Sequence, residues 1–330
     1  MYSEDEMASA VTAGVLTQAT AESLRVYVDG LRRTTVADDE RFRLIAGFND
    51  IFVVVACALL LAALARIFGE LRPWLGGLAV AAAAWGLAEF FVRKRRMALP
   101  AIVLLLAFEG GLFVGGMLPD SNGHPNFILG SLLSVAGAVL HWRRFHVPIT
   151  IAAGAAAVAG SIVAVFVALL PGAMNWTTTI AFVAGLAIFM LALRWDSQDP
   201  QRLTRKADVA FWLHLLAAPL LVHGVFRALG VTVGEGTLWQ AIIVLILYTA
   251  LALVSVSLDR RALMVSALGY VLYTFTAVLG KFGVVSSSFA ITALVLGSAL
   301  LLLSAFWHRS RAFVLRWVPA PVLHWIPPAR

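Results

Sequence analysis

Residues 91–111 read FVRKRRMALPAIVLLLAFEGG, and this stretch decides how the rest of the chain is interpreted. Four consecutive cations, Arg93, Lys94, Arg95 and Arg96, separate two long apolar runs, and one acid, Glu109, lies within the second run. A bilayer core about 30 Å thick takes roughly 20 apolar residues of helix. The stretch therefore predicts two membrane helices that meet in a short, positively charged turn.

The composition of the whole chain agrees with this interpretation. Of its 330 residues 61% are hydrophobic and only 13% are charged, whereas soluble domains have about 25% charged residues. So little charge cannot cover a globule of this size in water, and we predict a polytopic membrane protein. The net charge of +7 does not indicate a nucleic-acid partner, because the cations fall in short loops between apolar runs.

The apolar runs predict an all-α fold with ten transmembrane helices. They are continuous and do not alternate as barrel strands would. Residues 1–46 are interpreted as a cytoplasmic helical segment, 47–307 as the transmembrane domain and 308–330 as a cytoplasmic interfacial tail. The ten predicted spans are 48–68, 73–92, 98–118, 126–142, 147–170, 176–194, 208–226, 238–257, 262–280 and 284–306.

The distribution of cations predicts the orientation. With the N-terminus inside, 21 of the 25 Lys and Arg residues fall in cytoplasmic segments, so the positive-inside rule places both termini in the cytoplasm of a bacterial inner membrane. Anchors facing an anionic inner leaflet are expected among the loop cations and the tryptophans of the tail. These anchors are Arg93, Lys94, Arg95, Arg96, Arg143, Arg144, Arg260, Arg261, Trp317 and Trp325.

Two of the basic turns resemble each other. Arg95-Arg96 is followed by Pro100, and 48 residues later Arg143-Arg144 is followed at the same spacing by Pro148. A proline is tolerated in the first turn of a helix, where its missing N–H needs no partner. The pattern predicts that 73–118 and 126–170 are similar helical hairpins in a parallel repeat, unless the two turns arose independently.

The N-terminal segment predicts two short helices. Gly14 can end the first, and Thr20 can cap the second. Leu24, Val28 and Leu31 would then share one face. That face would pack on the protein itself or on a protein partner.

This beginning, AVTAGVLTQATAESLRVYV at 10–28, followed by the hydrophobic helices, resembles bacterial multi-pass membrane proteins of the DUF2157 type. Those proteins open with a G-x-L-(S/T) helical hairpin, and here the four residues are Gly14-Val15-Leu16-Thr17. The family has no assigned function, so the resemblance implies a membrane protein but no catalytic residues.

Chemistry at membrane depth is predicted from the ionisable residues, because a charge there is costly and usually functional. Glu109 would be protonated at neutral pH and face other helices, with Gly110, Gly111 and Gly115 permitting close contact. It would then either carry protons or act as a structural hydrogen-bonding group. Candidates for a substrate or proton path are Glu109, Glu89, His214 and His223.

The alternatives for these residues are structural. Glu89 can pair with Arg93 four residues later. His214 and His223 are nine residues apart and do not form one metal site, while His141 would be interfacial. The sequence lacks HExxH, CxxC, P-loop and dinucleotide-binding motifs, so we expect no enzyme, no metal and no cofactor. Two functions remain: a carrier-like, proton-coupled small-molecule transporter, or a membrane scaffold or sensor that acts through its N-terminal segment.

Overall fold

The computed structural model describes residues 9–24, 48–119, 123–170, 172–199, 204–228, 238–281 and 288–318. Apart from one isolated bridge between Pro119 and Pro125, these residues form helices and turns. The chain divides into two compact units, residues 1–42 with Arg330, and residues 43–329.

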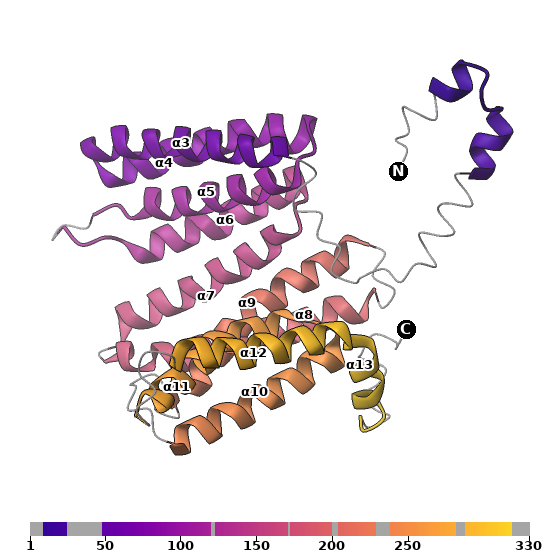
Figure 1. The fold of residues 1–330 in the computed structure, drawn as a ribbon. Coiled ribbons are helices and arrows are strands. Elements are labelled where there is room, and N and C mark those ends of the chain that lie inside the picture. The colour runs from indigo at the N-terminus through magenta and orange to yellow at the C-terminus, as the bar shows by residue number, and fades with distance from the viewer. Residues whose placement is uncertain are drawn as a thin grey trace. The chain divides into compact units, whose positions relative to one another are not determined.

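Each of the ten predicted apolar segments coincides with one helix of the second unit (Figure 1). A π-helical turn, η1 (Glu89–Lys94), follows α4, and a short 3-10 helix, η2 (Ala173–Trp176), precedes α8. The helices are α3 (Phe48–Leu71), α4 (Pro73–Ala88), α5 (Ala98–Gly116), α6 (Phe127–Phe145), α7 (Ile149–Leu169), α8 (Thr177–Ser197), α9 (Arg205–Ala228), α10 (Leu238–Leu258), α11 (Ala262–Lys281), α12 (Ser288–Ala305) and α13 (Trp307–Leu315).

Among the described residues, seven helices are long and apolar enough to cross a membrane, or eight if α12 and α13 form one bent span. The break between α12 and α13 turns the chain by 77°. Large apolar side chains cover outward faces of these helices: Leu59 of α3 is 68% exposed and Leu294 of α12 is 70% exposed. Such faces are stable in lipid and costly in water. The chain is therefore a multi-pass helical membrane protein.

The helices pack largely in chain order. Each helix from α3 to α7 contacts the next, α9 contacts α7, α8 and α11, and α10 contacts α11 and α13 (Figure 1). The pair α4 and α5 is very close because glycines face each other: a Cβ built on Gly77 would lie 2.5 Å from the Gly115 nitrogen, and one on Gly111 would lie 2.7 Å from the Gly77 carbonyl. The prediction of close contact through Gly111 and Gly115 is confirmed, whereas Gly110 faces open space.

Three turns between helices share a backbone feature. The non-glycine residues with positive φ in the described chain are Arg96, His146 and Asp259, one in each of the turns α4–α5, α6–α7 and α10–α11. In other respects the turns differ. Pro100 is the third residue of α5, whereas Pro148 directly precedes α7. α4 also ends in a π-helical turn, and α6 does not. The two prolines therefore do not occupy equivalent positions, which weakens the predicted repeat.

In the first unit, short helices span 9–12 and 18–24. Gly14 follows the first in a left-handed conformation with φ of 72°, so the predicted end of that helix is confirmed. The second helix is capped by Thr17, whose Oγ1 accepts a hydrogen bond from the Thr20 N–H at 3.2 Å; the prediction of Thr20 as the cap was wrong. Val28 and Leu31 lie outside the described residues.

Candidate functional site

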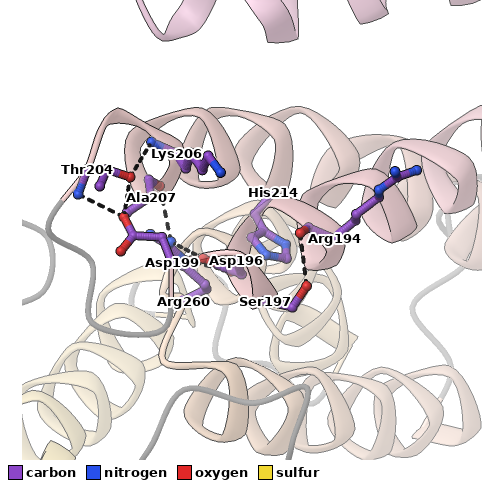
Figure 2. Close-up of polar contacts among 9 residues, drawn as sticks. All are labelled: Arg194, Asp196, Ser197, Asp199, Thr204, Lys206, Ala207, His214 and Arg260. Atoms are coloured by element: carbon purple, nitrogen blue, oxygen red, sulfur yellow. Dashed lines mark hydrogen bonds and ion pairs between the residues drawn. The ribbon is translucent and has the colours of Figure 1, made fainter.

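A buried ion pair links α8 to the turn between α10 and α11. The Arg260 guanidinium donates to both carboxylate oxygens of Asp196, at 2.5 and 3.3 Å. His214 of α9 completes the group, because its Nε2 lies 2.9 Å from the second Asp196 oxygen. Arg260 also donates to the carbonyl of Ala207 at 3.1 Å. We call Asp196, His214 and Arg260 the Asp196 cluster (Figure 2).

The surrounding backbone holds this cluster in place. The Arg260 N–H donates to the Ser255 carbonyl at 2.9 Å, and the Ser255 hydroxyl donates back to the Arg260 carbonyl at 2.5 Å. At the start of α9, Asp199 accepts hydrogen bonds from the N–H and hydroxyl of Thr204, at 2.8 and 2.6 Å (Figure 2). These bonds fix both segments that carry the pair.

The residue before Arg260 makes a second buried contact. The Trp307 indole donates to the Asp259 carboxylate at 2.6 Å, and Arg311 lies 3.8 Å from the other carboxylate oxygen. The guanidinium of Arg261 lies over the Trp307 ring, 4.9 Å from its centroid. Three consecutive residues of one turn therefore connect α8, α9 and α13.

The side chains of the Asp196 cluster form hydrogen bonds with one another. A carboxylate that accepts from a guanidinium and an imidazole has its charge compensated within the protein, as buried charges require. Two grooves on the described surface are lined by other residues, one between α3, α4 and α5 and one between α8, α10 and α13. The geometry therefore indicates a structural connection between helices.

Glu109 differs from the Asp196 cluster in that its carboxyl group has no hydrogen-bond partner within the described part of the chain. It is 8% exposed, and neither carboxyl oxygen has a hydrogen-bond partner among the described residues. The carboxyl group is directed to α6, since a Cβ built on Gly137 would lie 3.5 Å from its Oε1. Ser134 of α6 donates to the Glu109 main-chain carbonyl at 3.1 Å. The prediction that Glu109 faces other helices agrees with this placement.

His141, one turn beyond Gly137 on α6, is fully buried, which corrects the interpretation that it is interfacial. Its Nδ1 lies 3.1 Å from the Thr150 hydroxyl of α7, while Nε2 has no partner among the described residues. Aromatic rings surround it, with centroids at 6.2 Å for Trp85, 5.8 Å for Phe108 and 4.6 Å for Phe145.

Glu89 lies at the end of α4 and makes two ion pairs. The predicted pair with Arg93 is present at 3.3 Å. A closer partner comes from α6, because the Arg144 Nε donates to Glu89 at 2.6 Å and its second nitrogen donates at 3.0 Å. Glu89 therefore connects α4 with α6 at the edge of the helical bundle.

The four residues predicted for a path are not brought together. Glu109 contacts α6, His214 belongs to the Asp196 cluster, and His223 is exposed on α9. Among the predicted anchors, Arg260 is 2% exposed and paired with Asp196, whereas Trp317 is 78% exposed. Trp325 lies outside the described residues. Within the described part of the chain, no group of three His, Cys, Asp or Glu residues could hold a metal ion.

The sequence analysis missed Asp196 and Asp259 and wrongly placed His141 at the interface. Asp196 was missed because the predicted span ended at 194, whereas α8 continues to Ser197. The signal was an acid beside Arg194 and Trp195, within one turn of an apolar helix. No protein-family model matches the chain, and comparison with curated proteins and with solved structures gives no match either.

Proposed function

We propose that the protein has ten transmembrane helices, α3 to α12, in a bacterial inner membrane, with both termini in the cytoplasm. The helices α6 and α11 have 19 and 20 residues, which corresponds to about 28–30 Å at 1.5 Å per residue and suffices for a bilayer core. α6 packs between α5 and α7, both of which are long and apolar enough to span. The orientation rests on the cation distribution.

We further propose that the protein is a proton-coupled small-molecule carrier and not an enzyme. The observation that carries this proposal is Glu109, a carboxyl group buried within the span α5 whose two oxygens have no partner among the described residues. An ionised carboxylate near the bilayer centre costs at least about 2.5–3.5 kcal/mol, so such a group is expected to be neutral and able to release its proton when its surroundings change.

Proton coupling can be tested in inverted membrane vesicles that hold an acid interior. A panel of small organic cations, amines and carboxylates is added while a pH-sensitive dye reports the gradient. At least one compound should dissipate the gradient with the natural protein and not with Glu109→Gln, which keeps the shape but cannot release a proton. Glu70→Gln is the matched control, because Glu70 is an exposed acid paired with Arg66. Equal dissipation by Glu109→Gln would refute the coupling.

A scaffold or sensor is the second candidate, and the first unit favours it. Residues 1–42 form a compact unit of their own, and Val15 in its described part is 77% exposed. Val15 lies in the turn between the two short helices, where its side chain is accessible to a partner protein. Because single exposed apolar residues are common on protein surfaces, the proposal depends on a crosslink. A photo-crosslinking residue at position 15 should then capture one defined membrane or cytoplasmic protein in cells, and Glu109→Gln should leave that crosslink unchanged.

A further inference from the structure

We propose that Glu109, His141 and Glu89 form a proton relay along α4, α5 and α6, with His141 as the intermediate group. The relay rests on the proton-coupled function proposed above and names the path of that proton. It also removes His214 and His223 from the path, because His214 is held by Asp196 and His223 is exposed on α9.

The first step joins Glu109 to His141. The Glu109 carboxyl group lies against Gly137, and His141 follows Gly137 by four residues on the same face of α6. Four residues correspond to about 6 Å along a helix, so the two groups lie at successive turns of α6, and in the relay the proton passes between them through bridging water. Both groups in this step have atoms that are available for hydrogen bonds. The two oxygens of Glu109 and the Nε2 of His141 are buried without a partner among the described residues.

Three aromatic rings and one hydroxyl group surround the buried imidazole of His141, and in the relay they offset part of the cost of a transient charge. Rings of Trp85, Phe108 and Phe145 lie around the imidazole with centroids within 4.6–6.2 Å. Aromatic faces attract cations, most strongly where water is excluded. Thr150 bonds the Nδ1 and orients the ring. With Nδ1–H donating to Thr150, the Nε2 lone pair is available to accept a proton.

The last step leads to the edge of the bundle. Trp85 contacts His141, and Glu89 follows Trp85 by four residues in the chain. On α6, Arg144 follows His141 by three residues and binds Glu89. The side chain of Glu89 is 31% exposed, so it exchanges protons with water. The π-helical turn begins at Glu89, and such turns often mark functional sites.

The proton balance is simple. Glu109 releases its proton to the Nε2 of His141, which leaves a carboxylate and an imidazolium. The imidazolium releases its Nδ1 proton to Thr150, whose hydroxyl proton passes through water to the Glu89 carboxylate and then to bulk water. These steps leave Glu109 as a carboxylate and His141 as the Nε2–H tautomer. A proton taken up by the reverse steps, from Thr150 to Nδ1 and from Nε2 to Glu109, restores both residues.

The other charged groups on the elements packed here lie near helix ends. On α3 these are Asp50, Arg66 and Glu70, and on α4 with its π-helical turn Arg93 and Lys94. Arg143 and Arg144 lie in the last turn of α6, and α7 contributes the neutral Thr150. None of them lies between Gly137 and His141 on the face of α6 that carries the relay.

The relay can be tested by infrared spectroscopy on the full-length protein in lipid vesicles. The carbonyl stretch of the protonated Glu109 carboxyl group is assigned by its loss in Glu109→Gln. After transfer to deuterated buffer, the band shifts as the carboxyl proton exchanges. His141→Phe should slow this exchange by at least about tenfold, because a positioned proton-transfer group typically contributes a factor of 10² or more. His223→Phe, the same change at an exposed position, should leave the rate unchanged.

Each outcome decides the inference. Exchange as fast in His141→Phe as in the natural protein would overturn the relay, and so would the absence of a protonated Glu109 band. Where His141→Phe does not fold, Thr150→Val serves instead, since it removes the Nδ1 partner and should also slow exchange. Glu89→Gln should slow it less, because water remains at the edge. Transport need not be measured, so failure of the relay and failure of the carrier function are distinguishable.

Discussion

Arg260 and Asp196 lie 64 residues apart in the chain and form an ion pair in which both side chains are only 2% exposed. Two opposite charges at the ends of different helices thereby become one neutral unit. A buried pair of this kind adds little net stability compared with apolar residues, but an unpaired charge in its place is very costly.

Asp196→Asn should therefore destabilise the protein by about 3–5 kcal/mol, because the Arg260 charge stays buried while its countercharge is removed. Unfolding in mixed micelles with increasing denaturing detergent measures the change. Replacing both residues, Asp196→Leu with Arg260→Met, should recover most of the loss.

An exposed pair supplies the control for this experiment. Arg66 and Glu70 are 3.1 Å apart with side chains 81% and 62% exposed. Glu70→Gln should change the unfolding free energy by less than about 1 kcal/mol. An effect of Asp196→Asn as small as that of Glu70→Gln would show that the buried pair does not connect the helices.

The close contact between α4 and α5 gives a second prediction. Gly77→Ala should destabilise the protein by about 1–3 kcal/mol, because the new methyl group meets backbone atoms that cannot move aside. Gly110→Ala is the matched control on the facing helix, where a Cβ would contact nothing within 4 Å. It should be neutral or stabilising by up to about 1 kcal/mol, since alanine favours the helix. Equal effects of the two changes would contradict the close packing.

The sequence predicts the helices of this protein better than its polar contacts. All ten apolar segments are helices, because the backbone in lipid must bond within its own segment. The pair Glu89–Arg93 was predictable, since residues four apart on a helix are neighbours. The stronger partner of Glu89 is Arg144, 55 residues away, and no local rule gives such a contact.

The absence of a local rule for long-range contacts also explains why Arg260 was predicted at the surface. An Arg-Arg turn between two apolar runs indicates the cytoplasmic surface, and Arg260 was predicted as an anchor there. Its neighbour Asp259 has a φ of 56°, and the turn directs Arg260 inward, to Asp196. Which of two adjacent arginines is buried depends on the position of α8, and that position follows from packing.

Asp259 gives a third prediction, about α13. Asp259→Ala removes the acceptor of the Trp307 indole and the carboxylate beside Arg311. Leaving the buried Trp307 indole N–H without its acceptor costs about 1–3 kcal/mol. Opening of α13 should become about five- to a hundredfold more frequent, since 1.4 kcal/mol corresponds to a factor of ten.

Limited proteolysis with trypsin measures this opening, because α13 contains Arg309 and Arg311. Cleavage at Arg309 should be faster in Asp259→Ala, and the fragments can be identified by mass spectrometry. Asp199→Asn is the comparison, since Asp199 bonds Thr204 at the start of α9. Equal acceleration in both variants would indicate general loosening rather than release of α13.

The number of spans gives the last prediction, and α6 decides it. In the proposed topology the chain begins inside and passes outward through α3, inward through α4, outward through α5 and inward through α6, so the end of α7 would lie outside. Asn175, in η2 after α7, is exposed. Asn175→Cys should therefore react in intact cells with a maleimide that cannot cross membranes, whereas cysteines at Ser3 and Ala329 should not. The natural Cys57 is buried and gives little background. If α6 did not span, Asn175 would face the cytoplasm and stay unlabelled, because the direction of α7 would be reversed.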